Sequence, residues 1–434
     1  GIKNVRLIAD NLAQVGPDYG KFDFIIAHGL YSWVPDEVQD AILRICRENL
    51  APQGVAYVSY NCLPGWRFRG ALRDMMIMHT RNFPDINQKV QQSRALLKFL
   101  AEACDENTAY GKHLRGELEL FSRCDDSYIA HEFLEDENRP LYFVDFLAQA
   151  AKHDLQYLGE AELSTMLTEN LPPQAAETLR KLKLPQVDVE QYMDFIRNRM
   201  FRSTLLVHKE VPINRNIDPS LVEQFYISPL VELSNPDAPP SEDAIYKYPA
   251  GGEIRLTEPF GKSLLRSIWE QGYHAVSCRE VIEKALDAAP LPEGITRETL
   301  RSQLQTALVS WAFRKIVDFY TAPLNYRKAS SQLPEALPFT RWQAHTSQRL
   351  TNQRGEMIPS DPFANKLVQL CDGTHDSTAL QLKLSSAAEA REFTINENDK
   401  PIEDPIRLRE TVSILLQNTL PRLYRLGFMC LSPS

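Results

Sequence analysis

Long hydrophobic runs are missing from this sequence of 434 residues, and none approaches the roughly 18–20 residues that span a bilayer. An excess of basic residues is missing too. The 48 Lys and Arg against 57 Asp and Glu give a formal charge of −9, which offers no global attraction to nucleic acid or to an anionic membrane. The seven cysteines form no C-x-x-C pair, which argues against a disulfide framework and a thiolate zinc site. We therefore expect no metal, no membrane span and a cytoplasmic location.

The N-terminus lacks both a starting Met and the features of a signal peptide, so we expect the chain to begin within a longer protein. What is present is ordinary for a globular protein. Apolar residues make up 43% and charged residues 24%, enough to bury a core. The length predicts about two to four domains.

The first 80 residues alternate between strand and helix patterns. β-Rich runs at residues 5–10, 22–29 and 55–60 predict three strands, and the 3.6-residue period of apolar positions predicts a helix over 36–50. Strand, helix and strand joined by short turns form a βαβ unit, so the strands at 22–29 and 55–60 should be parallel.

Later segments are expected to complete the same sheet. The polar helical pattern of residues 83–137 predicts an insertion, and residues 142–153 predict another helix. The runs at 155–158 and 203–208 then predict the last strands.

Two Pro-rich polar stretches, residues 234–241 and 330–338, predict linkers. Each is followed by the order helix, turn, helix, helix and strand, with the final strands at 316–320 and 427–431. This order is typical of a winged helix. The second copy carries a charged excursion at 396–404, which predicts a solvated loop.

Ligands of open α/β sheets bind at the C-terminal ends of parallel strands. Three such ends are readable here: Asp10 and its neighbour, the run HGLYSWVP at 28–35, and NCLPGW at 61–66. The aromatic and small polar side chains of the second and third ends suit a narrow semi-polar channel better than a phosphate cradle. Trp33 and Trp66 could equally serve only to anchor their loops, and the spacing does not decide between the two.

The runs HGLYSWVP and YNCLPGW resemble the signatures after the fourth and fifth strands in one bacterial family of S-adenosylmethionine-dependent methyltransferases. Members of this family carry a methyltransferase regulatory domain, and some are protein-lysine methyltransferases that act on cell-surface proteins. Residues 109–111, 127–134 and 142–143 resemble its regulatory segment. The resemblance covers most of the chain and implies an α/β plus α fold: a partial class I, Rossmann-like methyltransferase sheet with a helical insertion, then two winged-helix-like domains.

Four parts are expected on this basis. Residues 1–82 are the C-terminal half of a class I methyltransferase domain, and 83–212 are the regulatory segment with the helical insertion and the last sheet strands. Residues 213–330 and 331–434 are the first and second winged-helix-like domains. As in class I methyltransferases, the strand at 203–208 should lie antiparallel to its neighbour.

The resemblance implies S-adenosylmethionine as the methyl donor, but the chain departs from the family at the cofactor site. Class I methyltransferases have a Gly-rich turn after the first strand and an acidic residue after the second, and these 434 residues contain neither. By match to the family pattern, Asp10 faces the adenine amino group, and His28, Gly29 and Tyr31 lie on the methyl-donor side. The rest of the site would come from sequence outside this chain.

The loops after the second and third strands are expected to share one cleft for the acceptor, with Tyr31, Trp33 and Asn61 as its catalytic residues. Tyr31 would hydrogen-bond the incoming amine, and Trp33 would wall the channel and attract a cationic lysine. Asn61 would orient the amine or the methionine end of the cofactor. The alternative is that all three side chains only fix their loops.

Three other patterns in the sequence resemble functional motifs but do not meet their requirements. Gly261-Lys262-Ser263 lacks the earlier glycine of a P-loop and favours a helix start. His131-Glu132 lacks the second histidine of H-E-x-x-H and favours a solvated acidic helix. The first winged-helix-like unit has ten basic side chains against eight acidic ones between residues 258 and 328, a poor footprint for phosphate. We therefore expect a protein partner and no nucleic acid.

The sequence thus predicts an S-adenosylmethionine-dependent methyltransferase that methylates lysine side chains of a protein, and it leaves a homodimer open. The alternative is a catalytically silent regulatory or protein-binding module that retains a methyltransferase remnant. A Gly-rich strand–turn–helix encoded upstream would favour the enzyme, and a natural start near Gly1 would favour the silent module.

Overall fold

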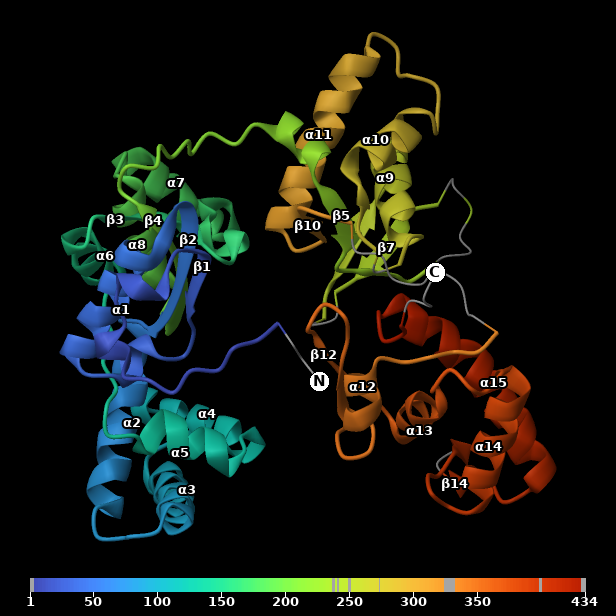
Figure 1. Cartoon of the computed structure of the whole chain (residues 1–434), viewed down its shortest axis with the longest axis horizontal. Helices are drawn as coiled ribbons and strands as arrows, with labels where there is room; N and C mark the ends of the chain where they lie inside the picture. Colours follow the sequence, from blue (N-terminus) through green and yellow to red (C-terminus); the bar gives the residue numbers. More distant parts are fainter. Residues whose placement is uncertain are drawn as a thin grey trace. The chain divides into compact units, whose positions relative to one another are not determined.

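The computed structural model describes residues 4–235, 239, 242–248, 251–272, 274–323, 332–397 and 400–430. The chain divides into two compact units, Gly1–Arg215 and Asn216–Ser434 (Figure 1). Within the described ranges, no helix combines the length and the apolar character that crossing a bilayer requires.

The first unit is built on a four-stranded sheet in the order β1-β2-β4-β3. Strand β1 (Phe22–Ala27) is parallel to β2 (Leu50–Asn61), and β4 (Phe201–His208) is antiparallel to both β2 and β3 (Leu155–Glu160). The predicted mixed sheet and the antiparallel strand at 203–208 are confirmed.

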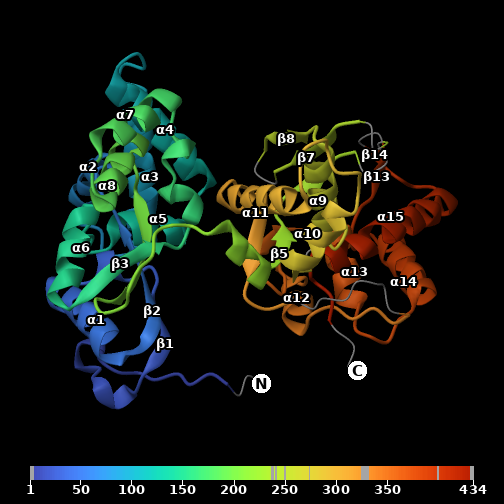
Figure 2. The same cartoon turned by 90° about the horizontal axis from the view of Figure 1, so that it is seen from above.

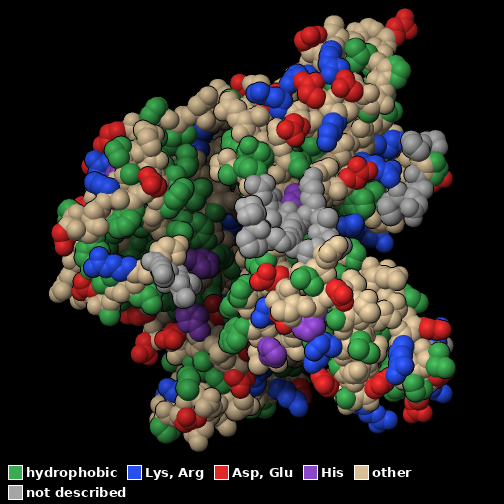
Figure 3. Space-filling model, turned by 45° about the vertical axis from the view of Figure 1, so that its right-hand side comes forward, with side chains coloured by type: hydrophobic (Ala, Val, Ile, Leu, Met, Phe, Trp, Pro, Cys, Tyr) green, Lys and Arg blue, Asp and Glu red, His purple; other side chains and the backbone are tan. Residues whose placement is uncertain are grey.

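One face of this sheet is covered by helices α1 (Asp36–Asn49) and α6 (Phe143–Lys152). The Phe146 ring of α6 stacks on Tyr60 of β2 with ring centroids 4.2 Å apart, and both side chains are buried. The opposite face is apolar and open: Phe24 and Ile26 of β1 are each 71% exposed. Figure 3 shows hydrophobic side chains gathered on the visible face of this unit.

Residues 5–10 do not form the strand that their composition predicts, and that expectation is wrong. Among the described residues they pair with no strand, and Leu7 is 92% exposed. Strand propensity reflects packing against a neighbouring strand, so a β-rich run without one stays irregular. Two short 3-10 helices follow instead, η1 (Leu12–Gln14) and η2 (Pro17–Tyr19).

The predicted helical insertion is present as a separate cluster of helices, seen together below the sheet in Figure 1. Its core includes Leu72, Leu97, Leu114, Phe121 and Phe133, all buried. The helices are α2 (Gly65–Thr80), α3 (Ile86–Ala103), α4 (Ala109–Arg123) and α5 (Asp126–Leu134). Between β3 and β4 lie η4 (Leu163–Met166), η5 (Thr168–Asn170), α7 (Pro173–Leu182) and α8 (Gln186–Arg197).

The second unit begins with a module of three helices around a small sheet in the order β10-β5-β9 (Figure 2). Its helices are α9 (Pro259–Trp269), α10 (Cys278–Leu286) and α11 (Arg297–Phe313), and η6 (Pro219–Gln224) precedes the sheet. Its strands are β5 (Tyr226–Pro229), β9 (Val276–Ser277) and β10 (Val317–Tyr320), with a second sheet of β6 (Glu232–Leu233), β7 (Ala244–Lys247) and β8 (Glu253–Leu256). Gly261-Lys262-Ser263 lies in the first turns of α9, as expected.

The last module repeats the helical order. It contains α12 (Pro338–Gln343), α13 (Pro362–Leu370), α14 (Ser377–Glu389) and α15 (Pro405–Arg425), with the hairpins β11 (Arg349–Thr351)–β12 (Met357–Pro359) and β13 (Asn396–Glu397)–β14 (Lys400–Pro401).

Two details of this module differ from expectation. The charged excursion at 396–404 contains a short hairpin rather than only a loop, because β13 and β14 pair. The expected strand at 427–431 is reduced, within the described residues, to an isolated bridge between Ala336 and Met429. Residues 236–238, 240–241 and 324–331, which hold much of the two expected linkers, lie outside the described residues.

Candidate functional site at the ends of β1 and β2

The loops after β1 and β2 converge because the two strands are parallel neighbours, which places their C-terminal ends at one edge of the sheet. Two hydrogen bonds join the loops directly. The backbone N–H of Gly29 donates to Ser59 Oγ at 2.9 Å, and the backbone N–H of Asn61 donates to Ser32 Oγ at 2.8 Å. The two segments therefore lie together at one edge of the sheet, as the strand–helix–strand order of the sequence predicts.

His28 and Gly29 lie together on the open side of this edge. The Nδ1 atom of His28 is 3.1 Å from both Tyr57 Oη and Ser59 Oγ, and Tyr57 Oη donates to Ser203 Oγ at 2.9 Å. His28 is exposed, and Gly29 has φ +63° with no atom within 4 Å of where a Cβ would stand. A ligand can thus approach the Gly29 backbone closely, next to a fixed imidazole.

Asp10, the third expected cofactor residue, is placed apart from this pair. Its carboxylate accepts hydrogen bonds from the Tyr19 hydroxyl and from the backbone N–H of Asn11 at 2.8 Å. Tyr19 precedes β1, whereas His28 follows it. The tyrosine hydrogen bond lowers the pKa of Asp10. The separation has the same cause as the missing strand at 5–10, since no described neighbour fixes this segment against the sheet.

Tyr31 occupies a core position. Its side chain is fully buried, with its ring 5.3 Å from Phe146, and its hydroxyl donates to Gln149 Oε1 at 2.6 Å. Burial raises the pKa of this hydroxyl above its ordinary value. The side chain of Gln39 donates to the Tyr31 carbonyl at 2.7 Å. This geometry fits the loop-anchoring alternative and corrects the expectation that Tyr31 faces an incoming amine.

Trp33 belongs to an aromatic cluster that three elements supply. Its ring lies edge-on to Trp66 of α2 at 6.2 Å and 4.4 Å from the His131 ring of α5. Trp33 is half-buried, Trp66 is buried and His131 is exposed. The cluster therefore presents an aromatic surface at the same edge as His28, contributed partly by the segment that resembles the regulatory domain.

Asn61 is held by a segment that returns to the sheet after α5. Its amide donates to Asn138 Oδ1 at 3.3 Å, and its carbonyl accepts from the backbone N–H of Leu141 at 3.1 Å. The backbone N–H of Arg139 donates to the Ser32 carbonyl at 2.8 Å. We call residues 137–141 the strap. The strap fixes both loops at once, so Asn61 lies at the edge where the loops meet but points toward the strap.

The sequence interpretation missed the roles of His131 and Glu132. Glu132 is half-buried rather than solvated, and burial raises the pKa of its carboxyl, against the opposing charges of His131 and Arg69. Arg69 of α2 donates to the Tyr128 hydroxyl at 3.2 Å. The apolar positions Ile129 and Phe133, which flank His131 in α5, were the available signal, but they do not reveal which element the helix packs on.

A buried ionic cluster anchors α8 to the sheet. The Arg202 guanidinium of β4 contacts Glu160 at 2.7 Å, Asp194 at 2.8 Å and Glu190 at 3.2 Å, and it lies 3.8 Å from the centre of the Phe143 ring. Burial raises the pKa of Glu190 and Asp194, while Arg202 opposes that shift. The cluster joins β3, β4 and α8 of the regulatory segment. Because its side chains are buried, we assign it a structural role and not a catalytic one.

Among the described residues, no group of three or more His, Cys, Asp or Glu side chains is arranged to hold a metal ion.

Comparisons with known proteins bear on the family to which the chain belongs. A family model described as "Predicted methyltransferase regulatory domain" matches residues 125–208, and one described as "PKMT, C-terminal winged helix domain" matches residues 333–428. The solved structure of PKMT2 from Rickettsia typhi in complex with AdoHcy is similar with a TM-score of 0.86 and 31% identity. That similarity covers 99% of this chain and 85% of that chain.

Two relatives from Rickettsia prowazekii are also similar. The uncharacterized protein RP789 is 32% identical over 428 residues, which is 96% of this chain and 76% of that protein. The uncharacterized protein RP028 is 44% identical over 158 residues, which is 36% of this chain and 63% of that protein. The chain thus spans less than two thirds of the second relative.

The mixed sheet with its antiparallel last strand, the regulatory segment that supplies β3 and β4, and the terminal winged helix define a class, the S-adenosylmethionine-dependent methyltransferases with a regulatory domain. Within that class, the chain belongs to the bacterial PKMT family.

Proposed function

We propose that this protein takes part in transferring a methyl group from S-adenosylmethionine to lysine side chains of a protein substrate. The observation that carries the proposal is the convergence of the β1 and β2 loops with α5 of the regulatory segment, centred on the contact of Trp33 with His131. The structural similarity to PKMT2 in complex with AdoHcy covers 99% of this chain, and it supports S-adenosylmethionine as the methyl donor.

The residues present fit part of this cofactor. The open backbone at Gly29 and the exposed imidazole of His28 suit its methionine end. The Gly-rich turn and the ribose carboxylate of class I methyltransferases have no counterpart in the 434 residues. When bound, the cofactor supplies a sulfonium methyl group, and His28 and Gly29 would orient it.

The acceptor lysine must lose its proton before its nitrogen can attack a methyl group. Trp33, with Trp66 packed edge-on against it, can cover the alkyl part of a lysine, and an aromatic ring attracts the ammonium on approach. Removal from water lowers the pKa of a lysine, which favours the neutral amine. Asn61, held by the strap, would orient that amine through its amide. Positioning both reactants lowers the barrier further.

We propose protein contacts, not nucleic-acid contacts, for the winged-helix modules. The basic side chains of α11 are already paired: Arg301 with Glu223 at 2.7 Å, and Arg297 with Glu283 at 2.8 Å. All seven cysteines are free thiols, which supports the proposed cytoplasmic location. The four-part division at 82, 212 and 330 and a homodimer stay predictions.

The test compares this chain with the complete product of its gene. Calorimetry with S-adenosylmethionine should give weak or no binding to these 434 residues and clear binding to the complete product. The complete product should transfer labelled methyl groups to lysines of a protein substrate. The silent-module alternative requires that the complete product neither binds the donor nor transfers a methyl group.

A further inference from the structure

A cavity of about 850 Å³ lies between the two modules of the second unit. Strand β12 forms one wall, the C-terminal part of α15 a second, and residues of β6 and β7 a third. Its charged side chains are four basic and two acidic: Lys247, Arg354, Arg422, Arg425, Glu232 and Glu356. The volume lies within the range of binding sites for small ligands and short peptide segments.

Two of these four cations are compensated. Arg354 contacts Glu356 at 2.6 Å and donates to Ser228 Oγ at 2.8 Å, which also joins the two modules. Arg425 lies 4.0 Å from Glu232 and 4.9 Å from the centre of the Trp269 ring.

Lys247 and Arg422 are not compensated. Both are exposed, and neither forms an ion pair or side-chain hydrogen bond with any residue in the described part of the chain. The cavity therefore carries two positive charges that a ligand can neutralise, and it favours an anionic occupant.

The β12 wall adds an extended edge. Strand β12 pairs with β11 alone among the described strands. Hydrogen bonds from Asn352 N to Glu356 O and from Ser360 N to Gln348 O flank the pair Leu350–Ile358 in the alternating ladder. The backbone N–H and C=O of Met357 consequently point away from β11, and its side chain is 56% exposed. Such an edge can accept an added strand.

We propose that this cavity binds an extended acidic segment of the substrate protein, whose backbone pairs with Met357 of β12 and whose carboxylates meet Lys247 and Arg422. The identity of the partner as the substrate rests on the proposed function. The site itself lies in the second unit and needs neither cofactor nor acceptor lysine. It would select substrates by an acidic segment of their sequence rather than by the lysine alone.

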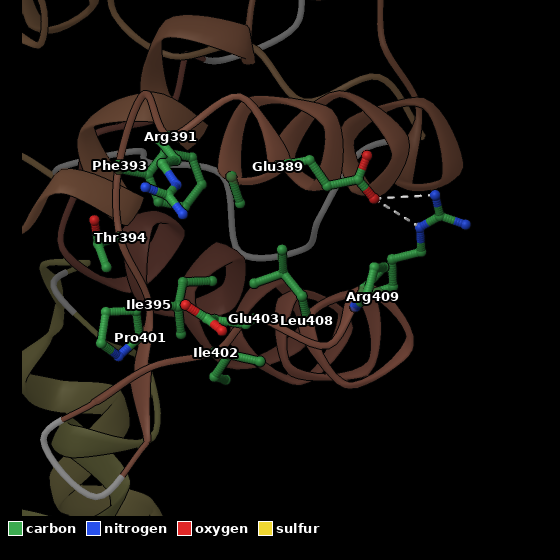
Figure 4. Close-up of a pocket in the computed structure, with 12 residues that line it drawn as sticks. Glu389, Arg391, Phe393, Thr394, Ile395, Pro401, Ile402, Glu403, Leu408 and Arg409 are labelled. Atoms are coloured by element: carbon green, nitrogen blue, oxygen red, sulfur yellow. Dashed lines mark hydrogen bonds and ion pairs between the residues drawn. The ribbon is translucent and has the colours of Figure 1, made fainter.

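A second cavity in the last module provides the contrast. It has about 800 Å³ and lies beside the β13–β14 hairpin, where Glu389 of α14 bonds Arg409 of α15 (Figure 4). Arg391 and Glu403 balance one another among its remaining charges. It therefore has no surplus charge to select an acidic segment, and Arg391 serves as a matched control.

The experiment is a fluorescence-polarisation titration of the full 434-residue chain with a labelled peptide that alternates glutamate and valine. We expect saturable binding, weakened roughly tenfold or more by Lys247→Glu with Arg422→Glu, and unchanged by Arg391→Glu. A lysine–valine peptide should not bind. A glutamate–valine peptide methylated on alternate backbone nitrogens should bind more weakly, because it cannot donate to the Met357 carbonyl. Circular dichroism confirms that each variant is folded.

Absence of binding by the acidic peptide, or equal binding to the wild-type chain and the double variant, would overturn the proposal. So would dependence on Arg391, which would place the site in the other cavity. In a further arm, free glutamate is added at a concentration equal to that of the glutamate residues in the peptide. If it displaces the peptide completely, the cavity binds a small anion and not an extended segment, and the proposal is overturned. No methyl donor is present, so failure here leaves methyl transfer untouched, and failure of methyl transfer leaves this binding measurable.

Discussion

The imidazole of His131 lies 4.4 Å from the indole of Trp33, so a helix of the regulatory segment rests on the loop that follows β1. The helical insertion separates the two residues in the sequence. Their contact gives the regulatory segment a direct physical connection to the proposed acceptor side, because a change at α5 would move the Trp33 ring. Trp33 also contacts the ring of Trp66 of α2 edge-on at 6.2 Å.

Removing the His131 ring should therefore affect the reaction more than the fold. In the complete enzyme, His131→Ala should lower kcat/KM by about tenfold. Without the His131 ring, Trp33 is no longer held in place and the acceptor lysine is positioned less well. The exposed side chain should change the unfolding free energy by less than about 0.5 kcal/mol. His131→Phe keeps a ring and should restore most activity. His345→Ala, at an exposed histidine of the second unit, is the control. Equal activity of His131→Ala and wild type would remove α5 from the site.

Tyr31→Phe tests the corrected role of Tyr31. The substitution deletes the hydroxyl that donates to Gln149 at 2.6 Å and leaves that acceptor without its donor. Urea unfolding should show a loss of about 1 kcal/mol, while turnover should fall by less than about twofold once protein is fully folded. A tenfold loss of turnover without a loss of stability would instead return Tyr31 to the acceptor channel.

Arg202→Met should be strongly destabilising, because it removes the ion-pair partner of buried Glu190 and leaves buried Glu160 and Asp194 with Arg199 alone. Breaking a buried pair from one side costs about 3–5 kcal/mol. Arg44→Met, which removes a partly exposed pair with Glu48 on α1, should cost less than about 1 kcal/mol. Thermal unfolding of both variants gives the comparison. Similar melting temperatures for the two would show that the Arg202 cluster is not the anchor of α8.

Much of the fold follows from local pattern. The helix at 36–50 and the strands at 22–29 and 55–60 were predictable because periodicity and turn residues agree with the final packing. The strand expected at 5–10 does not form, because a strand needs a neighbouring strand to pair with and not only a β-rich composition. The strand expected at 427–431 is likewise reduced, within the described residues, to the bridge of Met429 with Ala336.

The site was harder to predict than the sheet. The meeting of the β1 and β2 loops follows from parallel pairing, which the βαβ pattern contains. The direction of the Tyr31 side chain and the approach of α5 to Trp33 depend on how helices pack on the sheet. No spacing in the sequence encodes that packing, so the sequence predicts Tyr31 in the acceptor cleft and does not reveal the contact of His131 with Trp33.

The ion pair of Glu210 with Arg47 predicts a pH dependence. The Arg47 hydrogen bond lowers the pKa of Glu210 from 4.5 to about 2. A folded-state pKa below the unfolded value stabilises the fold above about pH 4.5, and that contribution disappears as the pH falls through about 2. The melting temperature of Glu210→Gln should therefore lie below that of wild type at pH 6 and approach it toward pH 2–3. Arg47→Gln should abolish the difference, whereas a gap that persists at low pH would contradict the pairing.

Asn61 and Asn138 together test whether the strap or the substrate uses the Asn61 amide. Their side chains are joined by one hydrogen bond of 3.3 Å. If Asn61 orients the acceptor, Asn61→Ala should lower turnover by at least about tenfold with a nearly unchanged melting temperature, and Asn138→Ala should lower it far less. If Asn61 only holds the strap, the two single variants should lose the same activity and the double variant should lose no more than either. Steady-state kinetics of the three variants in the complete enzyme separates these outcomes. We expect the first, because the strap also holds the loops through the backbone bonds of Arg139 and Leu141, which neither substitution removes.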